Sequence, residues 1–390
     1  MGIRANAPHN DYLIELIRAT LLHTELPPMP ADCDLEALSA LIQSQQIVSL
    51  VYPEICRHPH LQSVRTALER RNMMQIPKVI NQDLEIQKWL DAAEAAGIDC
   101  IPLKGYWLRQ LYPAPIMRSM TDFDVLLRQL DRDTINPWME SLGYKVKEEE
   151  EIDYHDSFSK EPWVYMELHR NLTLDAPNRD AWESRIWNNA VALPGRKHIF
   201  RMSWEDFYIF HLIHMHKHFM DRGSGMKGII DIHVFMQAHG KELDRQYLAE
   251  QLKAHKLDSY AAYMEKLADI WLGDGESDDD SRLVTDYLAG CGMFGNIETR
   301  RAIRISQGNG NLAYNKFRYR MQLLFPGVKQ MKRRFPSVAK FPFLLPFYWI
   351  ARFFQSVFLK HRTTSLLNFD HIDDQKCAEM NQIFTITGTK

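Results

Sequence analysis

The chain has few cysteines, and none lies in a pattern that binds a metal or builds a disulfide framework. Its 390 residues include 5 cysteines, no two of which form a C-x-x-C pair. This spacing argues against a cysteine-rich zinc site and against a small oxidised scaffold. Met1–Asn10 is polar and lacks the apolar core of a secretion signal. We therefore expect a protein of the reducing cytoplasm.

Several common catalytic motifs are also missing. The sequence contains no Gly-x-Ser-x-Gly elbow, no His-Glu-x-x-His and no Rossmann fingerprint. The glycine-rich turn at Gly223-Ser-Gly225 is not followed by Gly-Lys-Ser/Thr, so it is not a P-loop. A hydrolase triad and an NAD-dependent activity consequently have no local support.

Acidic residues are absent from one long segment near the C-terminus. Residues 300–364 contain 14 Lys or Arg and no Asp or Glu, although the net charge of the chain is −3. Such a basic segment suits contact with a nucleotide, a nucleic acid, an acidic partner or a membrane surface. Folding back onto the acidic remainder of the chain would satisfy its charge equally well, and composition leaves both alternatives open.

Within that segment, Phe341–Leu359 is strongly apolar and nearly long enough to cross a bilayer. It also holds Pro342, Pro346, Arg352 and Gln355, which predict that it does not span. A buried helix hairpin is the favoured interpretation, and a helix lying on a membrane surface is the alternative. A cytoplasmic protein with peripheral membrane contact is compatible with the second.

Apolar periodicity divides the chain into three regions. Residues 1–96 show helical spacing, residues 97–200 alternate short strands and helices, and residues 201–390 are helical again. We expect helices at Asp11–His23, Asp34 to about Leu50, and Leu61–Ala96, the last ending at Gly97. The expected strands are 98–103, 123–127, 144–147 and 163–169. This predicts an α+β fold in which a small mixed-sheet module is flanked by N-terminal and C-terminal helical regions.

Two aspartates carry most of the functional argument. Asp122 and Asp124 are two residues apart in a β-like run, so on a strand both carboxylates point to one face. Carboxylates held side by side repel each other unless a cation lies between them. This arrangement is typical of sites that hold Mg²⁺ against a nucleoside triphosphate.

A third carboxylate is predicted on another strand. Glu167 and His169 share one face of the strand 163–169, opposite Met166 and Leu168. An antiparallel neighbour would bring Glu167 beside the two aspartates and complete a set of three metal ligands. The alternative for Glu167 is an ordinary exposed strand residue.

Positive groups precede the aspartates by about one short helix. Lys104-Gly105 ends a strand and opens a helix, where backbone N–H groups and the lysine charge suit phosphate oxygens. Arg118 would neutralise triphosphate charge, or pair with Asp122 or Asp124 when no metal is bound.

A histidine-rich helix, Phe207–Met220, is the other candidate site. His211, His214 and His218 fall on one stripe, near Lys227 and Asp231 in sequence. Three interpretations stay open. The histidines and Asp231 bind a transition metal for a phosphohydrolase; the helix walls a nucleotide cleft; or the histidines are core residues bonded to backbone.

Taken together, Leu103-Lys-Gly105, Arg118-x-x-x-Asp122-x-Asp124 and Glu167-x-His169 resemble the uncharacterised bacterial nucleotidyltransferase family of the polymerase-β-like superfamily. The histidine helix and the N-terminal helical region extend the resemblance over most of the chain. It implies a nucleotidyltransferase fold, two Mg²⁺ ions, and transfer of a nucleoside monophosphate with loss of pyrophosphate. One departure is that Tyr106 follows Gly105 where the superfamily normally has serine or glycine.

We therefore expect an Mg²⁺-dependent nucleotidyltransferase that uses a nucleoside triphosphate and an unidentified acceptor. Asp122, Asp124 and Glu167 would bind metal and carry the catalysis. The nucleotide would be held by Lys104, Gly105, Arg118, His169, His214, His218 and Lys227. The rivals are the metal phosphohydrolase and a non-catalytic binding protein with the same fold, which Tyr106 favours.

Overall fold

The computed structural model describes residues 7–129, 131–147, 155–172, 179–332, 335–358 and 374–389. The chain forms two compact units, one of Met1–Phe219 with Ser224–Phe294 and one of Met220–Gly223 with Gly295–Lys390. Residues 1–6 and, within the basic segment, 333–334 and 359–364 lie outside the described residues. The predicted α+β fold is confirmed by a mixed sheet with helices around it, whereas the expected divisions after residues 96 and 200 stay a prediction.

The N-terminal region is helical, as the periodicity predicts. Its helices are α1 (Pro8–Leu22), α2 (Leu35–Ser44), α3 (Val48–Arg57) and α4 (Gln62–Ala96), with a 3₁₀ turn η1 at Pro59–Leu61. Helix α4 continues through Pro77, and Gly97 ends it with a φ of +70°, which glycine adopts without strain.

The single helix expected from Asp34 to about Leu50 is instead two helices, α2 and α3. The chain turns at Gln46, whose φ is +55°. The side-chain amide of the neighbouring Gln45 donates to the carbonyls of Leu288 and Ala289 and accepts from the N–H of Met226. These buried bonds to distant segments hold the turn in place, which local periodicity could not indicate.

The described strands of the central module form a five-stranded sheet in the order β1-β2-β5-β4-β3. They are β1 (Cys100–Pro102), β2 (Phe123–Leu127), β3 (Lys145–Val146), β4 (His155–Lys160) and β5 (Val164–His169). Strand β2 pairs parallel with β5 and antiparallel with β1, so the antiparallel neighbour predicted for Glu167 is wrong. The antiparallel partner of β5 is β4, which reverses the chain before β5 enters beside β2.

Short elements link these strands. They are α5 (Gly105–Leu108), the 3₁₀ turns η2 (Arg109–Leu111) and η3 (Pro115–Met117), and α6 (Arg132–Ser141). The side chain of Asp131 caps α6 by accepting from the N–H of Asp133. Strand β4 was not predicted, and neither were α7 (Arg179–Asn189) and the small pair β6 (Val191–Ala192) and β7 (Phe200–Arg201).

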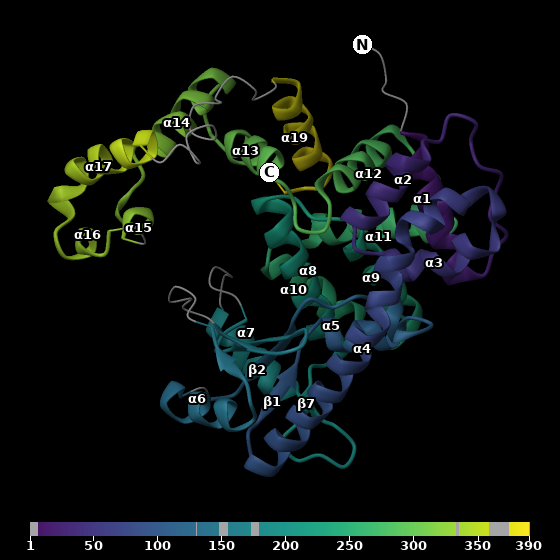
Figure 1. Ribbon diagram of the computed structural model, residues 1–390, viewed down its shortest axis with the longest axis horizontal. Coiled ribbons are helices and arrows are strands. Elements are labelled where there is room, and N and C mark those ends of the chain that lie inside the picture. The colour runs from purple at the N-terminus through teal and green to yellow at the C-terminus, as the bar shows by residue number, and fades with distance from the viewer. Residues whose placement is uncertain are drawn as a thin grey trace. The chain divides into compact units, whose positions relative to one another are not determined.

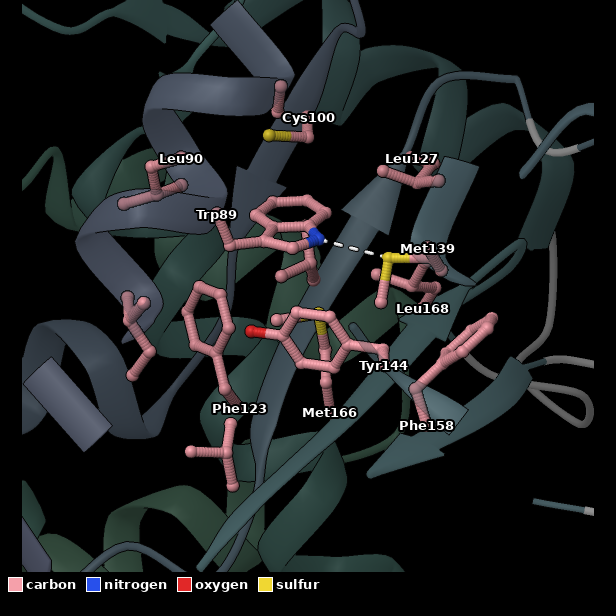
Figure 2. Close-up of a cluster of buried hydrophobic side chains, with 14 of the residues drawn as sticks. Trp89, Leu90, Cys100, Phe123, Leu127, Met139, Tyr144, Phe158, Met166 and Leu168 are labelled. Atoms are coloured by element: carbon pink, nitrogen blue, oxygen red, sulfur yellow. Dashed lines mark hydrogen bonds between the residues drawn. The ribbon is translucent and has the colours of Figure 1, made fainter. Parts of the chain in front are cut away.

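One face of the sheet packs against α4 and α6, and Figure 1 shows α4 lying beside β1. Figure 2 shows the resulting core, in which Trp89 of α4 lies against Phe123 of β2 and donates its indole N–H to the sulfur of Met139, 3.1 Å away. Alternate residues of β2 and β5 enter this core: Phe123, Val125, Leu127, Val164, Met166 and Leu168. The residues between them therefore face the opposite side of the sheet.

The rest of the first unit is helical: α8 (Trp204–Asp221), α9 (Lys227–His239), α10 (Arg245–Ala254), α11 (Asp258–Leu272) and α12 (Asp279–Cys291). The last two residues of α8, Met220 and Asp221, belong to the second unit. Helices α9 and α11 pack together, and the ring of Tyr208 on α8 stacks on Phe235 of α9 with centroids 5.2 Å apart.

The second unit holds α13 (Ile297–Ser306), α14 (Leu312–Leu324), α15 (Val328–Met331), α16 (Ser337–Lys340), η4 (Pro342–Leu344), α17 (Leu345–Phe358) and α19 (Asp374–Ile386). The buried hairpin predicted around residues 341–359 is wrong, since Phe343 and Phe347 are 73% and 68% exposed. Helix α17 packs against α15 and η4 along only part of its surface. None of the described helices has the length and apolar character needed to cross a membrane.

Candidate functional site

Three carboxylates converge on the sheet face opposite the hydrophobic core. Asp124 of β2 is paired in register with Glu167 of β5, and Asp122 lies just before β2 on the same side. One oxygen from each of the three lies within 4.8 Å of the others. An oxygen cluster of this kind is suited to a hard divalent cation.

Asp124 is the most heavily contacted of the three. Its Oδ2 lies 3.2 Å from the ammonium nitrogen of Lys104, and its Oδ1 lies 3.4 Å from Nε2 of His169. Burial by itself would raise the pKa of Asp124, but the charge of Lys104 and the bond to His169 outweigh it and lower that pKa. Asp124 is therefore ionised throughout the neutral range.

Asp122 shows the opposite behaviour. Burial, followed by the charges of Asp124 and Glu167, raises the pKa of Asp122 to about 7. Without a cation, the cluster thus retains a proton close to neutral pH because three carboxylates cannot all ionise so close together. This is the electrostatic condition expected of a site that a cation completes.

Two histidines border the cluster. Nε2 of His169 lies 3.5 Å from Oε2 of Glu167, and Nε2 of His155 lies 3.6 Å from the same oxygen. His155, Glu167 and His169 form a second group that could hold a metal ion. His155 was missed because β4, His-Asp-Ser-Phe-Ser-Lys, has only one large apolar residue, Phe158, so its strand periodicity is hidden.

The turn at Lys104-Gly105 lies directly against the cluster, as its order in the chain suggested. A methyl group added to Gly105 would come within 2.9 Å of the sulfur of Met120 and 3.3 Å of Nη1 of Arg118, so glycine allows this close approach. Helix α5 has only four residues. The positive charge at this turn therefore comes mainly from the Lys104 ammonium, because so short a helix contributes little dipole at its N-terminus.

Tyr106, at the position where the resemblance predicts serine or glycine, packs against the hydrophobic core. Its ring packs against Phe123 and Trp107, with centroid distances of 5.7 and 4.9 Å. The departure from a phosphate-binding serine therefore has a packing role.

Arg118 has a different partner from those expected. Its Nε and Nη2 donate to the two carboxylate oxygens of Asp231 at 2.7 and 2.8 Å, and Tyr112 donates to the same carboxylate at 2.8 Å. The predicted pairing with Asp122 or Asp124 is wrong, because the rigid fork of Arg118 is oriented toward α9. Nη1 of Arg118 faces the Gly105 turn.

Helix α8 lies over the carboxylate face of the sheet. The Lys104 ammonium lies 5.5 Å from the centre of the Phe210 ring. Burial, followed by the charge of Lys104, lowers the pKa of His214 well below its usual value. The charge of Asp124 opposes this shift but is outweighed. Nε2 of His218 is 2.9 Å from Nε2 of His214, so the pair continues away from the cluster along α8.

The histidine stripe does not assemble into a metal site. Burial lowers the pKa of His211 to about 4, and Asp231 is occupied by Arg118 and Tyr112. Among the described residues, neither group that could hold a metal includes His211, His214 or His218. The geometry therefore does not support the phosphohydrolase interpretation.

The matched family model is that of an uncharacterised nucleotidyltransferase, and it covers residues 31–273, more than half of the chain. The chain belongs to this nucleotidyltransferase family. No curated protein and no solved structure matches it. The match includes the carboxylate cluster, the Lys104-Gly105 turn, Arg118 and helices α8 and α9.

Membership in the nucleotidyltransferase family supports nucleotidyl transfer as the general activity and a nucleoside triphosphate as substrate. The cluster supplies an acidic group that could hold the divalent metal such enzymes use.

Lys227, the last of the predicted nucleotide contacts, donates to the carbonyl and hydroxyl oxygens of Ser119, each at 3.1 Å. Burial, followed by the charge of Arg118, lowers the pKa of Lys227 to about 7.

The affinity of this nucleotidyltransferase for a divalent cation is expected to depend on pH. Below about pH 7, Asp122 carries a proton that a cation must displace, because burial and Asp124 raise its pKa. The association constant for Mn²⁺ should therefore rise about tenfold per pH unit toward pH 7 and level off above it.

Calorimetric titration of Mn²⁺ between pH 5.5 and 8.5 measures this dependence. In the Asp122→Asn variant binding should be weaker and should lose most of the slope. An equal affinity of the unaltered protein at pH 5.5 and pH 8 would contradict the assignment of the proton to this cluster.

Proposed function

We propose that the protein is an Mg²⁺-dependent nucleotidyltransferase of the polymerase-β-like superfamily, which moves a nucleoside monophosphate from a nucleoside triphosphate to an acceptor. The observation that carries the proposal is the convergence of Asp122, Asp124 and Glu167 within 4.8 Å beside the Lys104 ammonium. Family membership supports the general activity, and the charge pattern of the site supports the metal.

The donor set fits Mg²⁺, which prefers carboxylate oxygens to imidazole nitrogens. Asp122 and Asp124 would hold two ions together with the triphosphate, and Glu167 would complete the set. Bound Mg²⁺ supplies charge neutralisation at the phosphates and a template for in-line displacement. The raised pKa of Asp122 fits this interpretation, because the positive side chains of the protein do not balance the negative charge of the three carboxylates.

The positive groups around the cluster would bind and orient the triphosphate. Lys104 and the backbone at Gly105 lie at the Asp124 side, and Nη1 of Arg118 faces the same turn. The nucleotide would be contacted by His169 from the sheet and by His214 and His218 from α8. Lys227, whose ammonium carries only part of its charge near pH 7, would hold Ser119 and the adjoining chain in position.

Glu167 is more accessible than Asp124, with 31% of its side chain exposed against 11%. We assign it to orient or deprotonate the acceptor hydroxyl. The acceptor oxygen forms a bond to the α-phosphorus while the bond from that phosphorus to the β-bridging oxygen breaks, and pyrophosphate leaves. The hydroxyl proton passes to Glu167. Most of the rate enhancement would come from positioning and charge.

Equilibrium binding of ATP, CTP, GTP and UTP, with and without Mg²⁺, tests this function directly. We expect at least one nucleotide to bind, and to bind more tightly when Mg²⁺ is present. If all four fail to bind under both conditions, the proposal is overturned. Binding without pyrophosphate release in the presence of candidate acceptors would favour the rival of a non-catalytic binding protein.

For the basic segment 300–364 we propose a second, peripheral function in contact with an anionic membrane surface. Its described part exposes large apolar side chains on α17 and η4, namely Phe343, Phe347, Ile350, Phe353 and Phe354, each more than half exposed. The sequence around them carries basic residues and no acidic ones. An exposed apolar face with basic surroundings is typical of helices that lie in the membrane interface.

The full chain is expected to sediment with vesicles containing anionic phospholipid and not with neutral vesicles. Phe343→Asp combined with Phe347→Asp should weaken this binding at least about tenfold, because the apolar face would then carry charge. Ile80→Asp, at a position of α4 that is 55% exposed, is the matched control and should bind like the unaltered chain. Equal binding of all three proteins would rule out this face as the contact.

A further inference from the structure

A cavity of about 520 Å³ lies in the first unit, next to the carboxylate cluster. It is lined by the turn between α2 and α3, by the middle of α4, and by the segment around Met117 and Ser119. The volume is in the range of small-molecule sites.

The cavity is positively charged. Arg70, Arg71 and Lys78 of α4 line it, and it has no carboxylate in its lining. Arg71 and Lys78 are seven residues apart, two turns along one face of the helix. In the part of the chain that the structure describes, no carboxylate forms an ion pair with any of the three. Three cations around one hollow favour an anionic ligand.

Two polar atoms in the cavity wall lack a partner. Among the described residues, the hydroxyl of Ser49 and Oε1 of Gln75 are buried and form no hydrogen bond. Ser49 itself is 7% exposed. Both atoms lie beneath the cavity wall, so the three cations are the groups of the lining that a ligand would meet first.

The cavity adjoins the Asp122 side of the cluster. The Ser119 hydroxyl donates to the carbonyl of Gln46 in the cavity wall at 2.9 Å, and Ser119 precedes Asp122 by three residues. The ammonium of Lys78 is close enough to Asp122 for that carboxylate to raise its pKa against the effect of burial. A ligand bound by Lys78 would consequently extend toward Asp122.

We propose that this cavity binds the acceptor, and that the acceptor is a small molecule carrying a phosphate group. This inference rests on the proposed nucleotidyltransferase function. The triphosphate is assigned to Lys104 on the Asp124 side, which leaves Arg70, Arg71 and Lys78 on the Asp122 side for a second anion. A guanidinium group matches phosphate geometry especially well.

Calorimetric titration of the full chain with inorganic phosphate, in chloride buffer of constant ionic strength and without Mg²⁺, tests the cavity. We expect weak binding that falls at least tenfold in Arg71→Gln with Lys78→Gln. Lys88→Gln, on the same helix but outside the cavity, is the control and should bind phosphate normally. Thermal unfolding of each variant verifies the fold.

Two arms separate this inference from the proposed function. Asp124→Asn should keep phosphate binding while it loses Mg²⁺-dependent nucleotide binding. Phosphate binding that is absent, or equal in the cavity variants and the unaltered chain, would overturn the acceptor site whatever the nucleotide does. Loss of nucleotide binding in Lys78→Gln would assign the cavity to the triphosphate, which overturns this inference and leaves the proposed function standing.

Discussion

Asp124→Asn is expected to lower the rate of pyrophosphate release at least about a thousandfold. The substitution keeps the shape of the side chain but removes the carboxylate that Lys104 and His169 both contact and keep ionised. The site would then lose the carboxylate that holds the metal ions against the α-phosphate. The measurement is Mg²⁺-dependent pyrophosphate release with the nucleotide that binds most tightly.

Asp99→Asn provides the matched control for this loss. Asp99 pairs with Arg128 and His198 before the start of β1, at the end of that strand away from Lys104. We expect this variant to retain its activity within about twofold. A residual rate in Asp124→Asn close to that of the control would exclude the carboxylate cluster as the catalytic site.

The largest effect on stability is expected at Arg118. Arg118→Met would leave the carboxylate of Asp231 buried without its cation, and the side chain of Asp231 is only 3% exposed. Breaking one side of a buried ion pair typically costs about 3–5 kcal/mol of unfolding free energy. Burial alone would raise the pKa of Asp231, and Arg118 outweighs that and lowers it, so the carboxylate stays charged while paired. Urea denaturation measures the change.

The exposed pair of Arg132 with Asp156 is the comparison. Its arginine side chain is 45% exposed, so Arg132→Met should cost less than about 1 kcal/mol. Combining Arg118→Met with Asp231→Leu should recover much of the loss, because the Asp231 carboxylate is then no longer buried without its partner. Equal losses in Arg118→Met and Arg132→Met would contradict the structural role of the Arg118–Asp231 pair.

Local patterns predicted the parts of the fold that depend on local geometry. The strand at 123–127 has the predicted bounds, and the helix predicted from Leu61 to Ala96 is α4 and ends at Gly97. Strand β4 was missed because its alternation is almost entirely polar, with Phe158 as its one large core residue. Polar alternation carries little information on burial, so neither β4 nor the histidine that it contributes was visible.

The parts that failed depend on partners far apart in the sequence. Arg118 and Asp231 are separated by 113 positions, and nothing in the residues around Arg118 distinguishes Asp231 from Asp122 as its partner. Likewise, the turn at Gln46 is held by bonds to residues more than 180 positions away. The parallel pairing of β2 and β5 depends on β4, which occupies the other edge of β5.

The sequence by itself determined that Asp122 and Asp124 share one strand face and that Glu167 and His169 share another, because side chains alternate along every strand. Only the tertiary structure decided that these faces meet, that Lys104 neutralises Asp124, and that Arg118 is bound to Asp231. It also opened a cationic cavity beside Asp122 that no motif indicated. The physical reason is that alternation is a property of the backbone, whereas charge pairing and cavities depend on how distant segments pack.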